Sequence, residues 1–277
     1  MKLAVLADVH ANFAALETVT AHIEAWRPDM VVVAGDVVNR GPRPLECLRL
    51  VQEKVHTSDW LTVRGNHEDY IIYQTEYSRH CRAEEREFYR YTHWTCARLN
   101  GQVPWLETMP FQRSLVGPDG GEIRVTHASM RGNRDGIFAR TSDEELRRQI
   151  MPPPKLFCVG HTHWPLVRQI DDTLVVNSGA VGLPFDGDTR ASYAQLVWQA
   201  GNWQAKIVRL DYDLAQTERD FTETEFLVEG GALAHLILDE LRTARSHLFR
   251  WTYQYQELIL RGEITMAESV QRFIADW

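Results

Sequence analysis

Short apolar runs alternate with longer amphipathic stretches along the first part of this chain, and the two patterns predict strands and helices in turn. Residues 12–26 carry apolar side chains at helical spacing, and Pro28 follows as a helix-ending residue. A second helix is expected near residues 44–53. Five short runs are rich in Val, Ile and Leu, as buried strands are, and they lie at 3–7, 30–34, 60–63, 123–126 and 156–159.

Strand signals dominate again after residue 111. Segments at about 112–117 and 122–126 flank Pro118-Asp119-Gly120-Gly121, which predicts a hairpin. Further strands are expected at about 156–160, 165–170, 173–177, 191–198 and 203–209. Two mixed sheets that face each other, with helices outside, fit this order. The predicted fold class is therefore α/β, a four-layer αββα sandwich of two mixed sheets with a helical insertion and a helical C-terminal appendage.

Two helical segments add to this core, which we expect to span residues 1–210. The insertion, 68–109, contains a predicted helix at 83–100 and many aromatic rings: Tyr70, Tyr73, Tyr77, Phe88, Tyr89, Tyr91 and Trp94. We interpret it as a helical pair packed on the core, and a cap that stacks a nucleobase or aromatic leaving group is the alternative. The C-terminal extension, 211–277, predicts one helix over 231–248 that continues through 249–261, and another at 265–275. It packs on the core, supports a dimer or forms part of a substrate rim.

Composition narrows the class of protein. The 277 residues include 30 basic and 38 acidic side chains, and a net charge of −8 argues against a general nucleic-acid or anionic-membrane surface. No segment reaches transmembrane length, and the apolar run before Asp8 is shorter than a signal-peptide core. The four cysteines, Cys47, Cys81, Cys96 and Cys158, form no CxxC motif and predict reduced thiols. We expect a cytoplasmic enzyme, and the sequence is compatible with a homo-oligomer.

A polar motif follows each of the five apolar runs: Asp8-Val9-His10, Gly35-Asp36, Gly65-Asn66-His67-Glu68, His127 and Gly160-His161-Thr162-His163. In open α/β sheets the carboxyl ends of strands converge on one ligand site, so these side chains should meet. Oxygen and imidazole donors without a thiolate suit Mn²⁺, Fe²⁺, Zn²⁺ or Co²⁺. Two such ions about 3.5–4 Å apart need a shared anionic ligand. Asp36 is the natural bridge, because it lies in the middle of the motif set and its carboxylate has two oxygens.

This order of motifs, DxH, GD, GNH, H and GHxH, resembles the calcineurin-like metallophosphoesterase superfamily over roughly residues 1–210. The resemblance implies two divalent ions, with manganese favoured and iron, zinc, cobalt or nickel as alternatives. It also implies a hydroxide nucleophile between the ions and His67 as the general acid that protonates the leaving oxygen. The implied ligands of one metal are Asp8, His10, His163 and Asp36, and those of the other are Asn66, His127, His161 and the same Asp36.

Two loops resemble different subfamilies. In the protein Ser/Thr phosphatases the second motif reads GDxVDRG, and its last Asp orients the histidine; this chain has Asn39, which can accept a hydrogen bond but brings no charge. Arg40 and Arg64 match the arginines that bind the phosphoryl oxygens there, since a guanidinium offers a planar fork. With Asn66, these two arginines are the expected substrate-binding residues, which stabilise the charge that develops on the phosphoryl group. Residues 177–193 instead resemble the NPGSVGxPRDGDxRASY stretch of bacterial phosphodiesterase-type members. The chain is thus a mosaic, and Arg131 and Arg134 are read as solvated loop arginines.

The expected activity is metal-dependent hydrolysis of phosphate esters, with phosphomonoesters or phosphoproteins leading as substrates. Alternatives are dinucleoside polyphosphates and cyclic-nucleotide or other phosphodiesters. An interaction scaffold on the same fold is the alternative class, but such scaffolds lose metal ligands or the catalytic histidine, and this chain retains them. No membrane partner is expected. The histidines outside the motifs are read as core or surface residues: His22, His56, His80, His93, His235 and His247.

Overall fold

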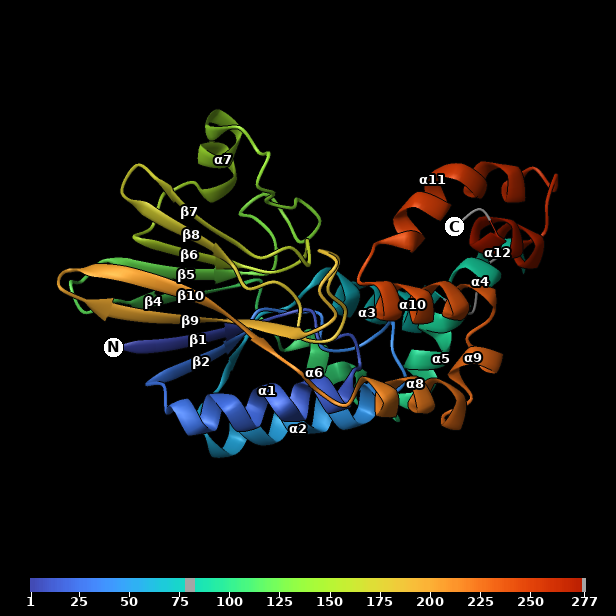
Figure 1. Ribbon diagram of the computed structural model, residues 1–277, viewed down its shortest axis with the longest axis horizontal. Coiled ribbons are helices and arrows are strands. Elements are labelled where there is room, and N and C mark those ends of the chain that lie inside the picture. Colours follow the sequence, from blue (N-terminus) through green and yellow to red (C-terminus); the bar gives the residue numbers. More distant parts are fainter. Residues whose placement is uncertain (78–82, 276–277) are drawn as a thin grey trace.

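Two five-stranded mixed sheets lie at the centre of the computed structural model, which describes residues 1–77 and 83–275 (Figure 1). The first sheet has the order β10-β9-β1-β2-β3, with β1, β2 and β3 parallel and β9 and β10 antiparallel. Its strands are β1 (Lys2–Leu6), β2 (Met30–Val33), β3 (Leu61–Thr62), β9 (Ala191–Gln199) and β10 (Asn202–Leu210).

The second sheet has the order β4-β5-β6-β8-β7. Its three central strands are parallel and both edge strands are antiparallel. The strands are β4 (Gln112–Val116), β5 (Glu122–Thr126), β6 (Leu156–Val159), β7 (Leu166–Ile170) and β8 (Thr173–Asn177). The strands predicted after residue 111 all form, and their ends differ by no more than a residue or so, as strand assignments do.

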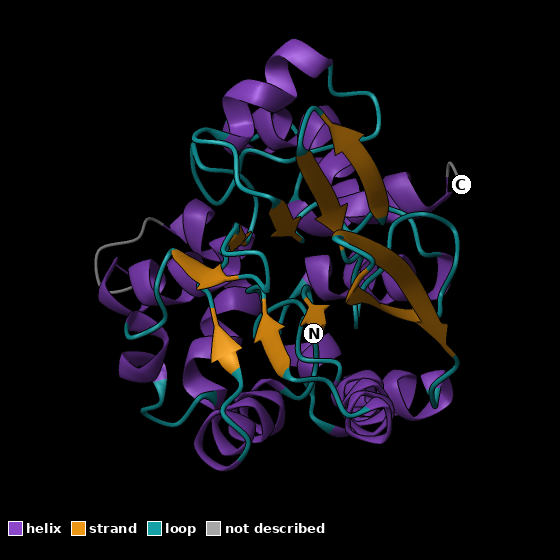
Figure 2. Cartoon of the chain, turned by 90° about the vertical axis from the view of Figure 1, so that its left-hand side faces the viewer, coloured by secondary structure: helices purple, strands orange, loops and turns teal. Residues whose placement is uncertain are grey.

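The alternation of side chains along β1 shows how the layers stack. Leu3 and Val5 pack against the second sheet, while Ala4 and Leu6 pack against helices α1 (Phe13–Trp26) and α2 (Pro44–Thr57). Helix α7 (Asp143–Ile150) covers the outer face of the second sheet. In Figure 2 the helices lie on both sides of the strands. The predicted four-layer αββα sandwich is confirmed.

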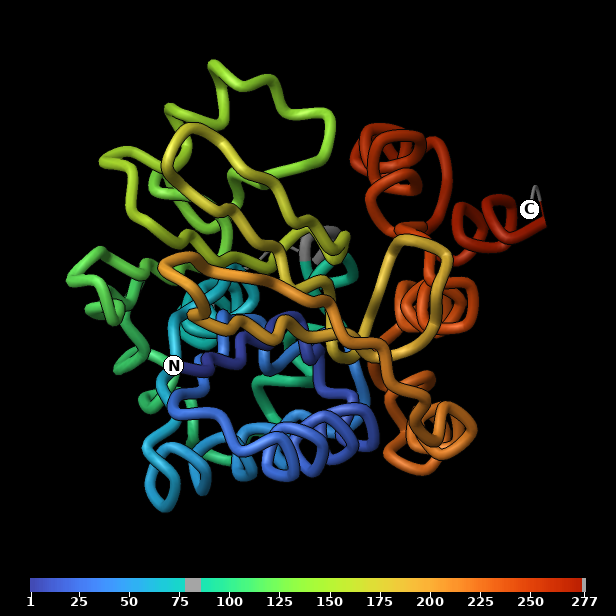
Figure 3. Tube along the Cα trace, turned by 60° about the vertical axis from the view of Figure 1, so that its left-hand side comes forward, coloured from blue at the N-terminus to red at the C-terminus, as the bar shows by residue number. Residues whose placement is uncertain are grey.

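The helical insertion and the C-terminal extension lie together at one end of the sheets (Figures 1 and 3). Aromatic rings form part of their contact: the rings of Trp94 and Phe226 are 4.7 Å apart, and those of Phe88 and Trp251 are 6.0 Å apart. The insertion holds α3 (Asn66–Tyr77), α4 (Ala83–Phe88), α5 (Arg90–Arg98) and α6 (Val103–Glu107). The extension holds α8 (Leu214–Glu223), α9 (Phe226–Glu229), α10 (Ala232–Thr243), α11 (His247–Leu260) and α12 (Met266–Ala275). The boundary at residue 210 stays a prediction.

Two predicted helices were wrong in their continuity. The helix expected over 83–100 is broken at Tyr89, because Phe88 packs with the group around Trp251 while Trp94 packs with the group around Phe226. The helix expected to run from 231 to 261 ends at Thr243. Ala244 there adopts a left-handed conformation with φ 50°, and α11 restarts at His247.

Helices α6, α7, α8 and α9 were not predicted from the sequence. For α7 a signal was present, since the side chain of Ser142 accepts a hydrogen bond from the backbone N–H of Glu145, as an N-cap does.

Cysteines and histidines outside the motifs follow the expected pattern where the structure describes them. Cys47, Cys96 and Cys158 carry free thiols, and His80 and Cys81 lie outside the described residues. His22 is hydrogen-bonded to Tyr193 and His93 to Gln74, His247 is buried, and His56 and His235 are exposed. Over residues 1–77 and 83–275, none of the helices has the length and apolar character needed to cross a membrane.

Candidate metal centre

Six of the seven predicted metal-binding side chains lie in the turns that follow strands, and Asn66 begins a helix. Asp8 and His10 follow β1, and Asp36 follows β2. Asn66 begins α3, shortly after β3, so the third motif forms the first turn of that helix. His127 follows β5, and His161 and His163 follow β6. The parallel strands bring all seven side chains to one edge of the sandwich, where six of them are buried and His161 is half-buried.

One group of ligands gathers around Asp8, His10, Asp36 and His163, whose donor atoms all lie within 4.8 Å of one another. His10 Nε2 lies 3.1 Å from His163 Nε2 and 3.7 Å from Asp36 Oδ2, and His163 Nε2 lies 3.3 Å from Asp8 Oδ1. Asp8 Oδ1 is buried and has no hydrogen-bond partner among the described residues. A buried carboxylate oxygen without a partner is costly, and a cation at this position would satisfy it.

A second group shares Asp36 with the first. Asp36, His127 and His161 also have donor atoms within 4.8 Å of one another, with Asp36 Oδ2 3.3 Å from His127 Nε2. Asn66 joins them, because its Oδ1 lies 2.9 Å from His127 Nε2 and 2.8 Å from His161 Nδ1. The donor set of each group, carboxylate or carboxamide oxygen with imidazole nitrogen, fits a divalent cation.

Backbone carbonyls fix the tautomers of three of the four histidines. His127 Nδ1 donates to Ala34 O at 2.8 Å, His10 Nδ1 to Asn39 O at 3.3 Å, and His163 Nδ1 to Leu183 O. Each proton therefore sits on Nδ1 and leaves the Nε2 lone pair directed at the site, as second-sphere hydrogen bonds do for metal ligands. His161 is the exception and presents Nδ1.

Burial keeps most of these imidazoles neutral. It lowers the pKa of His10 and of His163 well below the usual range and the pKa of His161 to about 4. His127 differs: burial opposes its charge, but the Asp36 carboxylate raises its pKa to about 10, while His127 helps to lower the pKa of Asp36. This proton and a cation compete for the same lone pairs, so metal binding would release it.

Five of the proposed ligands have a strained backbone. Asp8, His10, Asp36, His161 and His163 all have φ between 46° and 68°, which non-glycine residues adopt at a cost of roughly 1 kcal/mol or more each. The motif glycines fit two demands of this site. Any side chain at Gly65 would clash, because its Cβ would lie 2.1 Å from Asp36 Oδ1, and Gly35 adopts a φ of 89° that a side chain would disfavour. Such strain persists where the surrounding fold imposes it, and it is typical of functional sites.

Glu68 anchors the two loops around Asp36, a role that the sequence analysis did not assign to it. Its fully buried carboxylate accepts the backbone N–H groups of Asp36 at 2.8 Å, Val37 at 2.8 Å and Gly65 at 2.9 Å. Burial and the Asp36 carboxylate raise the pKa of Glu68 to about 7, while the N–H groups act in the opposite direction. The available signal was an acidic residue in the first turn of the helix that carries the third motif.

Replacing Glu68 by glutamine should destabilise the protein by about 2–4 kcal/mol, because an amide nitrogen cannot accept a hydrogen bond and would face backbone N–H groups. For a chain of this size the melting temperature should fall by on the order of 5–10 °C. Thermal unfolding beside Glu53→Gln, a change at an exposed position of α2, measures the difference. Equal melting temperatures would contradict the anchoring role.

His67 adjoins the first ligand group, with its ring 4.9 Å from that of His10. Asn39 lies beside it as expected, but as a donor: Asn39 Oδ1 accepts the backbone N–H of Arg40 at 3.0 Å, and Asn39 Nδ2 is 3.0 Å from His67 Nδ1. The side chain of Asn39 does accept a hydrogen bond, as the sequence allows, but from the backbone of Arg40 and not from His67. With Nδ1 accepting, the His67 proton resides on Nε2, and burial lowers the pKa of His67 to about 3.

Arg40 and Arg64, which were both predicted to bind the phosphoryl group, lie in different surroundings. Arg40 lines a cavity together with Asn66 and His67, and its Nη2 donates to Glu240 Oε2 on α10 at 2.6 Å. Arg64 is not part of that lining, and its Nε lies 2.9 Å from Asp69 Oδ1.

The loop arginines differ as well. Arg131 pairs with Asp135 and Glu145 on the surface, as expected of a loop arginine. Arg134 instead lies over the ring of Tyr70, with Cζ 4.5 Å from the ring centre.

Comparison with known proteins gives concordant matches. The model of the "Calcineurin-like phosphoesterase superfamily domain" matches residues 1–201. The uncharacterized protein MJ0912 of Methanocaldococcus jannaschii is 25% identical over 236 residues, which cover 76% of this chain and 88% of that protein. The crystal structure of a metallophosphoesterase from Sphaerobacter thermophilus shares 26% identity at a TM-score of 0.66, covering 88% of this chain and 100% of that one. The hypothetical protein PH1004 of Pyrococcus horikoshii has the same fold, with a TM-score of 0.74 at 19% identity over 88% of this chain and 98% of that one.

Proposed function

This chain belongs to the calcineurin-like phosphoesterase superfamily, and we propose that it is a dimetal-dependent hydrolase of phosphate esters. The observation that carries the proposal is the pair of ligand groups that share the Asp36 carboxylate. A scaffold without chemistry has no need of seven converging donors, five of which have a strained backbone. The class of ester, monoester or diester, is decided by the groups around the metals.

The proposed ligands divide between two cations, with manganese favoured and iron, zinc, cobalt or nickel as alternatives. When bound, two divalent cations supply charge that stabilises the phosphoryl group and activates water for attack. Asp36 would serve both ions. The other ligands of one ion are Asp8, His10 and His163, and those of the other are Asn66, His127 and His161.

Two further side chains would act on the substrate. His67 Nε2–H donates to the leaving oxygen, since Asn39 holds the opposite nitrogen as an acceptor. Arg40, which lines the cavity together with Asn66 and His67, binds a non-bridging phosphoryl oxygen. Arg64 is a second candidate for the same role, but it would first have to separate from Asp69.

Phosphodiesters are the second candidate substrates, and one observation favours them. Both candidate arginines are paired with carboxylates, Arg40 with Glu240 and Arg64 with Asp69. The positive charge offered to a phosphate is therefore smaller than two unpaired arginines would provide. A diester carries one negative charge fewer than a dianionic monoester, and a dinucleoside polyphosphate carries several more. The ion pairs thus weigh against the polyphosphate alternative.

A hydrolysis panel tests the proposal. Metal-free protein reconstituted with Mn²⁺ should hydrolyse p-nitrophenyl phosphate or its bis ester, and a chelator should abolish the activity reversibly. A phosphopeptide and diadenosine tetraphosphate complete the panel, and the same assays follow with iron, zinc, cobalt and nickel. Absence of hydrolysis with every substrate and metal would contradict the proposal and favour the scaffold.

Replacing Arg40 by alanine should lower kcat/KM on monoesters roughly ten- to a hundredfold, and on diesters less, because a charge-assisted contact to the phosphoryl group is lost. Lysine should restore little, since it lacks the guanidinium fork. The single change also leaves the fully buried Glu240 carboxylate unpaired, so the double variant Arg40→Ala with Glu240→Gln is the matched control for folding. If kcat/KM fell equally on monoesters and diesters, or more on diesters, Arg40 would not bind the dianionic phosphoryl group of a monoester.

A further inference from the structure

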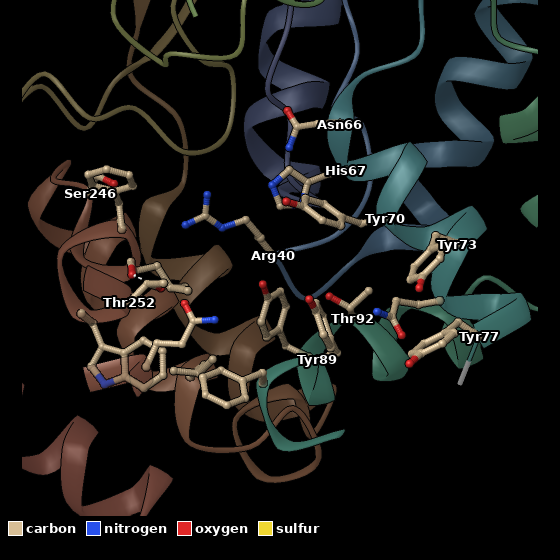
Figure 4. Close-up of a pocket in the computed structure, with 18 of the residues that line it drawn as sticks. Arg40, Asn66, His67, Tyr70, Tyr73, Tyr77, Tyr89, Thr92, Ser246 and Thr252 are labelled. Carbon is tan, nitrogen blue, oxygen red and sulfur yellow. Dashed lines mark hydrogen bonds between the residues drawn. The ribbon is translucent and has the colours of Figure 1, made fainter. Parts of the chain in front are cut away.

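A cavity of about 600 Å³ opens beside the candidate metal centre, between the helical insertion and the C-terminal extension (Figure 4). Asn66, His67 and Arg40 line it, so it is continuous with the site at which phosphate would react. Its size is in the range of pockets that enclose small organic ligands. Figure 4 shows Arg40 projecting into this space between the helices of the two segments.

Aromatic rings from both segments face this cavity. Tyr70, Tyr73 and Tyr77 come from α3, and Phe249 comes from α11. The rings of Tyr73 and Tyr77 are stacked, 5.0 Å apart with an angle of 18° between their planes. Tyr73 is 54% exposed and Phe249 is 76% exposed, so both sides of the cavity present large rings to water. Exposed apolar surface at a concave site is typical of a surface that a ligand covers.

The polar groups of the cavity are mostly uncharged. Gln74 and Thr92 come from the insertion, and Thr252 and Gln256 come from the extension. Arg40 is the one charged side chain in the described part of the lining, and Glu240 compensates it. Amides and hydroxyls can donate and accept hydrogen bonds along the edge of a heterocycle without favouring either sign of charge.

We propose that this cavity binds the leaving group of the substrate, and that the group carries an uncharged planar ring system, as a nucleoside does. This inference rests on the proposed hydrolase function. The base stacks on the exposed tyrosine and phenylalanine rings, and the ester oxygen lies at His67, the end of the cavity that adjoins the metal ligands. The helical insertion and the extension then act together as the specificity element, which gives the cap alternative of the sequence analysis a defined ligand.

A matched substrate pair isolates the base from the chemistry. Adenosine 5′-monophosphate and ribose 5-phosphate are both esters of a primary alcohol and differ by the base, and their methyl diesters form a second pair. In the pair that the protein hydrolyses, we expect kcat/KM to be roughly tenfold higher for the substrate that carries the base than for the substrate that lacks it. Stacking of a base on an aromatic side chain has an effect of that order. The ratio should fall toward one in Tyr73→Ala and in Phe249→Ala. Tyr253→Ala, an exposed change on the same helix outside the lining, should keep it.

Binding of adenosine to the metal-free protein, followed by calorimetry, separates the pocket from the reaction. Saturable binding that weakens in Tyr73→Ala and Phe249→Ala supports the pocket even if hydrolysis of every ester fails, in which case the proposed function is wrong. Hydrolysis of p-nitrophenyl phosphate or its bis ester without adenosine binding, and with a ratio near one, overturns the pocket and leaves the function standing.

Discussion

Asp36→Asn should reduce kcat by on the order of a thousandfold or more and lower metal occupancy at both positions. The Asp36 carboxylate lies 3.7 Å from His10 Nε2 and 3.3 Å from His127 Nε2 through the same oxygen, so both ligand groups depend on its charge. An asparagine supplies one oxygen and no charge. Charge stabilisation by two cations amounts to several kcal/mol, and each 1.36 kcal/mol is a factor of ten in rate.

The fold should survive this change. Asp36 Oδ1 accepts the backbone N–H of His67 at 2.8 Å, and the carboxamide oxygen of asparagine can accept the same bond. Elemental analysis of the reconstituted variant measures occupancy, and circular dichroism confirms folding. Asp172→Asn, a change at an exposed carboxylate in the turn between β7 and β8, is the control. Two full equivalents of metal in Asp36→Asn would refute the shared ligand.

His67→Ala should retain both metals and lose roughly a hundred- to ten-thousandfold in rate on esters with poor leaving groups. The loss should be smallest on p-nitrophenyl esters, because p-nitrophenolate leaves without a proton. The structural reason is the proton on Nε2, which the amide of Asn39 fixes through Nδ1.

The variant His67→Gln separates proton transfer from hydrogen bonding. Glutamine can donate a hydrogen bond to the leaving oxygen but cannot transfer a proton at neutral pH. Partial recovery relative to alanine would assign the effect to hydrogen bonding, and no recovery would assign it to proton transfer. A uniform loss on all leaving groups in His67→Ala would speak against any action on the leaving oxygen.

The sandwich and the convergence of the motifs were predictable because both depend on local signals. A short run of branched apolar residues indicates each buried strand, and a polar motif follows at the carboxyl end of that strand. Because the carboxyl ends of these strands meet at one edge, Asp8 and His163 come together although they are 155 residues apart in the sequence.

What escaped prediction depends on packing between distant segments. Glu240 pairs with Arg40 across 200 residues, and no pattern near either residue indicates the other. The helix breaks at Tyr89 and Ala244 also arise from tertiary contacts, which override a continuous helical period. The donor orientation of Asn39 depends on the backbone N–H of Arg40, and that geometry exists only once the loop is strained into the left-handed region.

The Arg40–Glu240 pair has a consequence for how such an enzyme could diversify. All seven proposed metal-binding side chains precede residue 164, whereas the partner of Arg40 and one wall of the cavity come from the last quarter of the chain. Mutations in the terminal helices can therefore change the surroundings of Arg40 and one wall of the cavity without altering any proposed metal-binding residue. Under the proposed function, two descendants of one ancestor would keep the same metal-binding residues yet accept different esters, with selection acting on a segment that carries none of the five motifs.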